Sequence, residues 1–245
     1  VAYARAAVAI VEAWSTTTST LVGACPDTGA CSTSLMVSRA APGLVHAVDV
    51  LRADGAIDGP TVDRFHVWIR DVIVPAASDR DNNWGDAGTY LRAVVATELD
   101  DDEGVAEAAR LWRERIDAVA PDGRIPEEVR REDAALLYSQ EALDYKVATA
   151  DVLGRHGVDV WEVEGRAGGS LRAAVDLVRR ALEDPSVWPV PADDLRVPTP
   201  AGMWPIVADR WPDGGFGPLA REAARHDDSG HSAITWTAIT HGPVA

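Results

Sequence analysis

The stretch PEEVRREDAALLYSQEALDYKVATADVLGRHG, residues 126–157, begins with a proline and ends with a glycine. Proline suits the first position of an α-helix, because its missing N–H would have no intrahelical partner there, and glycine commonly follows the last turn. Between these two residues, apolar side chains recur at three- and four-residue steps. The stretch therefore predicts one long helix.

The rest of the chain repeats this helical periodicity. Apolar stripes predict a helix starting near residue 83 and passing through Tyr90 and Leu99, and the segment from Pro185 to Gly217 predicts an ordered loop. Alternating strand patterns are almost missing. The other expected helices cover residues 2–14, 34–53 with an interruption at Pro42, 61–77, 105–120, 170–184, 218–226 and 233–239. We expect one all-α domain, residues 1–245, built of antiparallel helical hairpins.

Composition excludes some classes of function. The 245 residues carry a net charge of −16, whereas binding to nucleic acid or to an anionic membrane requires a basic surface. No apolar run is long enough to span a membrane. The sequence contains nine tryptophans but only two phenylalanines. Indoles stack well on sugar rings, but we expect most of them, such as Trp14, Trp68 and Trp112, in the core.

Cys25 and Cys31 lie in the segment VGACPDTGACSTS. In an oxidising compartment they would close a small disulfide ring, and in a reducing one they would be two thiols. We favour the disulfide, and hence a secreted or periplasmic protein. The chain begins at Val1, as a mature or trimmed form would.

The segment DRDNNWGDAGTY, residues 79–90, places Asn82 and Asn83 at the predicted start of a helix. An asparagine in this position either caps the helix or directs its amide towards an anion. The segment itself does not decide between the two roles.

Arg131 and Tyr138 are seven residues apart, so on a continuous helix they share one face. A guanidinium near a phenol favours the phenolate, and such a tyrosine can accept a proton and later return it. The alternative is a buried aromatic with a satisfied hydroxyl, which Tyr145, seven residues further on, supports.

These segments together resemble the alginate lyase family, whose members are polyuronate lyases of incomplete α/α toroid fold. The resemblance rests on AYARAAVAIVEAWSTT, on NNW at residues 82–84, on the arginine seven before the tyrosine, and on the helix that runs to GVDVW. It covers residues 1–190. It implies that Asn83 and Arg131 bind the uronate carboxylate and that Tyr138 transfers protons. The histidine after the family's asparagine pair is Trp84 here, and its Tyr-His pair is Tyr138-Ser139.

The implied reaction is β-elimination on a 4-linked acidic polysaccharide, with Asn82 and Trp84 beside the sugar. Without the motif histidine, one tyrosine serves both proton transfers most easily when the C5 proton and O4 lie on one side of the ring, as in mannuronan or glucuronan. Two alternatives stay open. One is a degenerate toroid that only binds carbohydrate, and the other is a glycoside hydrolase that uses Asp86 with Glu141.

The histidines offer replacements for the missing group. His46 and His66 lie on apolar helices and are expected in the core or on the surface. His226, His231 and His241 cluster near Asp227 and Asp228, a pattern that could suggest a metal. We expect no metal and no cofactor, and we expect His231 to face the substrate if the C-terminal segment covers the mouth of the toroid.

Overall fold

The structure, a computed structural model, describes residues 2–21, 33–189, 194–200 and 202–225. Helices dominate this part of the chain, which contains no β-strand, only an isolated bridge between Glu164 and Ser170. The α-helices are α1 (Ala2–Thr17), α2 (Thr33–Ala53), α3 (Gly59–Trp68), α4 (Asn83–Glu98), α5 (Asp102–Asp117), α6 (Pro126–Val129), α7 (Ala135–Arg155), α8 (Leu171–Glu183), α9 (Met203–Arg210) and α10 (Gly217–Arg225). The predicted all-α class is confirmed.

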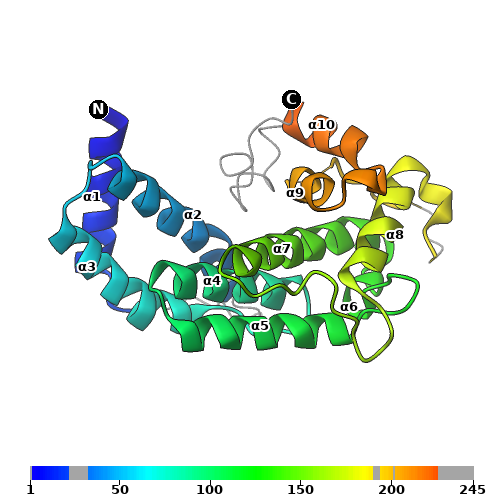
Figure 1. The fold of residues 1–245 in the computed structure, drawn as a ribbon, viewed down its shortest axis with the longest axis horizontal. Coiled ribbons are helices and arrows are strands. Elements are labelled where there is room, and N and C mark those ends of the chain that lie inside the picture. The colour runs from blue at the N-terminus through cyan, green and yellow to red at the C-terminus, as the bar shows by residue number, and fades with distance from the viewer. Residues whose placement is uncertain (1, 22–32, 190–193, 201, 226–245) are drawn as a thin grey trace.

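The helices form an open arc. In Figure 1, α1, α2 and α3 stand at one end, α8, α9 and α10 at the other, and α4, α5 and α7 lie between them. Helices α2, α4, α7 and α9 together line a cavity of about 410 Å³. This arrangement is an incomplete α/α toroid, as expected.

Three of the helices that line the cavity, α2, α4 and α7, run parallel. Arg52, Glu98 and Arg155, in the last turns of α2, α4 and α7, all line that cavity. Near the other end of α2, Arg39 Nη1 lies 3.6 Å from Glu141 Oε1 in the second turn of α7. The first turns of α4 and α7 therefore point the same way. Because a helix N-terminus carries a partial positive charge, the side of the arc on which these helices begin favours an anion.

The core follows α7, most of which is buried. Trp112 and Trp68 are buried as predicted, and the Trp112 Nε1–H donates to the Lys146 carbonyl at 2.9 Å. Trp14 contradicts the prediction, since it is 48% exposed on α1. It packs edge-on against Trp68, with ring centroids 6.3 Å apart, so only part of its surface is covered.

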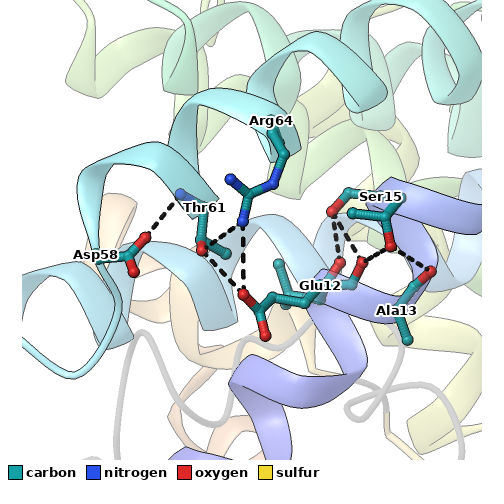
Figure 2. A network of polar contacts seen from close by, with 8 residues as sticks. Glu12, Ala13, Ser15, Asp58, Thr61 and Arg64 are labelled. Atoms are coloured by element: carbon teal, nitrogen blue, oxygen red, sulfur yellow. Dashed lines mark hydrogen bonds and ion pairs between the residues drawn. The ribbon is translucent and has the colours of Figure 1, made fainter.

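A polar network fixes α1 against α3 (Figure 2). The Asp58 carboxylate caps α3 by accepting from the Thr61 N–H at 2.8 Å. The Thr61 hydroxyl donates to Glu12 Oε1 of α1 at 3.2 Å, and Arg64 Nη2 reaches the same oxygen at 3.5 Å. These contacts set the register of the first helix. The expected break at Pro42 does not occur, because α2 continues through it.

The long helix expected over residues 126–157 is wrong at its start. It is divided into α6, a short 3₁₀ turn (Glu132–Ala134) and α7, and Pro126 does begin α6. Glu132 has a φ of 52°, a left-handed conformation that no α-helix continues through. Arg131 and Tyr138 therefore do not belong to one continuous helix.

The loop expected from Pro185 to Gly217 is also wrong in part, because it contains α9. Asp144 Oδ1 accepts the Met203 N–H at 2.8 Å and so satisfies one donor at the start of this helix. Trp204 is fully buried, and its Nε1–H donates to Gln140 Oε1 at 3.1 Å. Contacts with α7, remote in sequence, stabilise a helix that looks like a loop locally.

The predictions for Cys25, Cys31, His231 and the short helix at 233–239 concern segments outside the described residues.

Candidate functional site

The predicted site begins at the first turn of α4. Asn82 is the N-cap of this helix, and its Oδ1 accepts the Trp84 N–H at 3.0 Å. Asn83 is the first helical residue, only 1% exposed, and its Oδ1 has no hydrogen-bond partner within the described part of the chain. The sequence placed both residues correctly at a helix start. The capping role falls to Asn82, which leaves the Asn83 amide for another partner.

Two glycines hold this turn against the segment before it. A Cβ atom on Gly85 would lie 1.8 Å from the Arg80 carbonyl oxygen, and one on Gly88 would lie 1.8 Å from that of Ser78. The backbone of residues 78–80 can cross α4 this closely only because both positions lack a side chain. Arg80 then stacks over Trp84, with its guanidinium carbon 4.0 Å from the ring centroid. One face of the half-buried indole is thereby occupied.

Glu128 of α6 connects the turn to the predicted arginine. Its Oε1 accepts the Asn83 N–H at 2.6 Å, and its Oε2 lies 3.7 Å from Arg131 Nε. The Glu128 side chain is fully buried, whereas that of Arg131 is 33% exposed. A buried carboxylate thus ties the start of α4 to a guanidinium that solvent can reach.

Arg131 in turn covers Tyr138, with its guanidinium carbon 4.6 Å from the centroid of the phenol ring. This is a cation–π contact across the face of the ring. Tyr138 lies in the first turns of α7 and is half-buried, so its phenol is not packed into a dry interior. Contacts in series therefore link the Asn83 backbone to Glu128, Glu128 to Arg131 and Arg131 to Tyr138, although the helix expected to carry the arginine and the tyrosine is broken.

Below these residues lies an ion pair between α4 and α7. Lys146, the only lysine of the sequence, contacts Asp86, and the two side chains are 3% and 2% exposed. Glu141, the other acid considered for a hydrolase, lies beside Arg39 of α2. Each of these acids therefore has a cationic neighbour.

Burial dominates the titration of the groups beneath the site. It raises the pKa of Glu128 to about 7, with a further increase from Asp86, whereas the Asn83 N–H, Arg131 and Lys146 lower it. Burial also raises the pKa of Tyr145 far above its usual value, with smaller contributions from Glu141 and Asp144, against the opposing effect of Arg39. Tyr145, only 1% exposed, is thus a buried core aromatic, although its hydroxyl has no hydrogen-bond partner among the described residues, whereas Tyr138 is only half-buried.

Sequence reasoning missed Glu128, Lys146 and Arg39. Glu128 looked like an ordinary acid in the first turn of a helix. Lys146 carried a usable signal, because a lone lysine inside the apolar run ALDYKVATA needs a buried partner. Which acid is that partner could not be read from the sequence.

Other predicted features have plain outcomes in the described residues. His46 Nε2 lies 3.1 Å from Tyr90 Oη, and His66 Nε2 lies 2.8 Å from Glu98 Oε1, so both histidines have polar partners. Across residues 2–21, 33–189, 194–200 and 202–225, no group of three His, Cys, Asp or Glu side chains is placed to hold a metal ion. None of the described helices has the length and apolarity needed to cross a membrane.

The fold and this cluster define a helical toroid protein with an amide, a guanidinium and a phenol at one end of its central helices. Residues 1–188, well over half of the chain, match the sequence model of the family described as alginate lyase. The chain belongs to the alginate lyase family. A comparison with curated proteins gives no match.

Solved structures agree with this assignment at the level of the fold. A tyrosine-to-phenylalanine variant of alginate lyase A1-III, complexed with a tetrasaccharide, superposes with a TM-score of 0.73 at 16% identity over 87% of this chain. A histidine-to-alanine variant of the same enzyme, also complexed with a tetrasaccharide, superposes with a TM-score of 0.71 at 17% identity, again over 87% of this chain. An alginate lyase from Bacteroides ovatus superposes with a TM-score of 0.60 at 16% identity over 79% of this chain. This chain spans 65%, 66% and 55% of their respective lengths.

Proposed function

We propose that the protein is a polysaccharide lyase that cleaves a 4-linked polyuronate of mannuronan or glucuronan type by β-elimination. The observation that carries the proposal is the contact series from Asn83 through Glu128 and Arg131 to Tyr138. Family membership supports the reaction class.

Asn83 and Arg131 would neutralise the uronate carboxylate. The C5 proton of a uronate is too weakly acidic to be removed unless the developing enolate charge on the adjacent carboxylate is compensated. An amide at a helix N-terminus and a half-exposed guanidinium are suitable donors for that charge. Each well-placed donor lowers such a barrier by about 3 kcal/mol.

Tyr138 would transfer the protons. Its phenolate takes the C5 proton, the C–H electron pair forms the C4=C5 double bond, and the bond from C4 to O4 breaks. The phenol then returns the proton to the departing O4, so that the enzyme regains its starting state. General acid–base catalysis of this kind contributes on the order of 10² to 10⁴ in rate. A single tyrosine serves both steps when proton and leaving oxygen share one side of the ring.

Trp84 favours a second candidate, a toroid that binds a uronan without cleaving it. The tyrosine and the histidine substituted in the two alginate lyase A1-III structures are separated by the same number of residues as Tyr138 and Trp84. This equal spacing supports the proposal that Trp84 stands at the position of that histidine. An indole cannot exchange a proton or neutralise a carboxylate as a histidine does.

The test is incubation of the protein with polymannuronate, glucuronan and polyguluronate while the ultraviolet absorbance of the C4=C5 double bond is recorded. We expect absorbance with at least one of the first two polymers. Tyr138→Phe should abolish it with little change in the melting temperature. Tyr3→Phe is the matched control, because Tyr3 is 93% exposed on α1 and should leave activity unchanged.

Folded protein that gives no unsaturated product from any of these polymers would refute the lyase. Calorimetric binding of the polymers without turnover would then select the binding protein. New reducing ends without absorbance would instead select a glycoside hydrolase.

The acidic polysaccharide is the proposed partner, and Asn82, Trp84 and His231 are proposed to lie beside it. We also propose that residues 1–245 act as one toroid domain outside the cytosol, with Cys25 and Cys31 bonded. Thiol titration of the denatured, unreduced protein should then find no free thiol, and two free thiols would contradict the bond.

A further inference from the structure

Glu128 touches two residues of the proposed site, and each of its two carboxylate oxygens faces one of them. Its side chain is fully buried. One carboxylate oxygen holds the backbone of Asn83 and the other faces Arg131. Any influence of Glu128 on a bound sugar must therefore act through these two residues.

Glu128 and its three charged neighbours carry formal charges that cancel only when Glu128 is ionised. Arg131 faces it from the segment after α6, and Lys146 and Asp86 face it from α7 and α4. With Glu128 ionised, two cations and two carboxylates sum to zero. With Glu128 protonated, the same four groups carry one net positive charge. The protonation state of Glu128 thus changes how much of the Arg131 charge is left for a ligand.

We propose that Glu128 is a positioning residue of the site, which fixes Asn83 and Arg131 towards one sugar carboxylate and sets the effective charge of Arg131. The inference rests on the proposed function. It takes the roles of Asn83 and Arg131 as given and adds a residue that those roles do not require, so the role of Glu128 can fail while they stand.

The proposal has a pH signature within an accessible range, since burial raises the pKa of Glu128 to about 7. As the pH rises through this value, the carboxylate ionises and neutralises part of the Arg131 charge. An anionic oligosaccharide should then bind more weakly, by about tenfold, the order expected for one charge near a partly exposed ion pair.

The first experiment measures binding of oligomannuronate by calorimetry between pH 5.5 and 8.5, in the Tyr138→Phe protein so that substrate survives. We expect the dissociation constant to rise about tenfold through pH 7. Adding Glu128→Gln should remove the rise, because glutamine still accepts the Asn83 N–H but cannot ionise. Adding Glu127→Gln, the neighbouring acid that pairs with Arg130 at the surface, should leave the rise unchanged.

The second experiment measures turnover in the otherwise native protein. Glu128→Gln should lower kcat about tenfold at pH 8, because the arginine is then held by Tyr138 without a carboxylate, and Glu128→Asp should recover part of that loss. If native protein cleaves a uronan and Glu128→Gln matches Glu127→Gln in both binding and turnover, the positioning role is refuted and the lyase stands. A dissociation constant of the Tyr138→Phe protein that stays constant from pH 6 to 8 would also refute it. Absence of cleavage by the native protein overturns the proposed function instead, and the binding measurements still test Glu128.

Discussion

Asp144 should make the protein less stable as the pH rises from 4 to 8. Its side chain is 1% exposed inside α7 and accepts the Met203 N–H that starts α9. Burial, reinforced by Glu141, raises the pKa of Asp144 from 3.8 to about 8, although the Met203 N–H opposes the increase.

The direction follows from proton linkage. Between pH 3.8 and about 8, folded Asp144 keeps a proton that the unfolded chain releases. The stabilisation from this group is complete below the unfolded pKa and is lost as the pH rises through the folded pKa. Each tenfold change in proton affinity corresponds to about 1.4 kcal/mol, so the difference between a pKa of 3.8 and one of about 8 changes the free energy of unfolding by on the order of 5 kcal/mol. That is a large part of the ~5–15 kcal/mol by which folded domains are stable.

The perturbation is Asp144→Asn, which keeps an oxygen for the Met203 N–H and removes the titration. Urea unfolding at pH 5 and pH 8 gives the free energy of unfolding in each case. We expect the free energy of unfolding of the variant, taken relative to that of the native protein, to be a few kcal/mol higher at pH 8 than at pH 5. The control is Asp63→Asn, which changes an exposed acid on α3. Its free energy of unfolding should equal that of the native protein at both pH values. Equal pH dependence in Asp144→Asn and native protein would refute the reasoning.

Three further changes test the packing and the site. Lys146→Met should lower the free energy of unfolding, measured with urea, by about 3–5 kcal/mol, because it leaves Asp86 buried without its cation. Adding Asp86→Leu to the same protein should restore most of this loss. Gly85→Ala should lower the melting temperature by several degrees, because its Cβ would meet the Arg80 carbonyl, whereas Gly59→Ala, with nothing within 4 Å, should change it little. Trp84→His should raise kcat/KM on a uronan at least tenfold while Trp84→Phe does not, and equal rates would contradict our placement of Trp84.

The sequence determined the helical class and most helix positions, because apolar periodicity, prolines and glycines act over a few residues. It located α4 at its asparagine pair and α7 through most of its length. It failed at residues 130–134, where the chain leaves the helix although no proline or glycine marks the break. It also failed at α9, which depends on Asp144 and Gln140, respectively 59 and 64 residues before their partners Met203 and Trp204.

The site divides in the same way. The residue types and spacing of Asn83, Arg131 and Tyr138 were visible in the sequence, together with their resemblance to a family. Only the tertiary structure revealed that Glu128 joins the first two and that Lys146 pairs with Asp86. Local periodicity fixes which side of a helix a residue occupies. Which buried charges meet depends instead on how separate helices pack, because a charge removed from water is stable only beside a partner that the whole fold supplies.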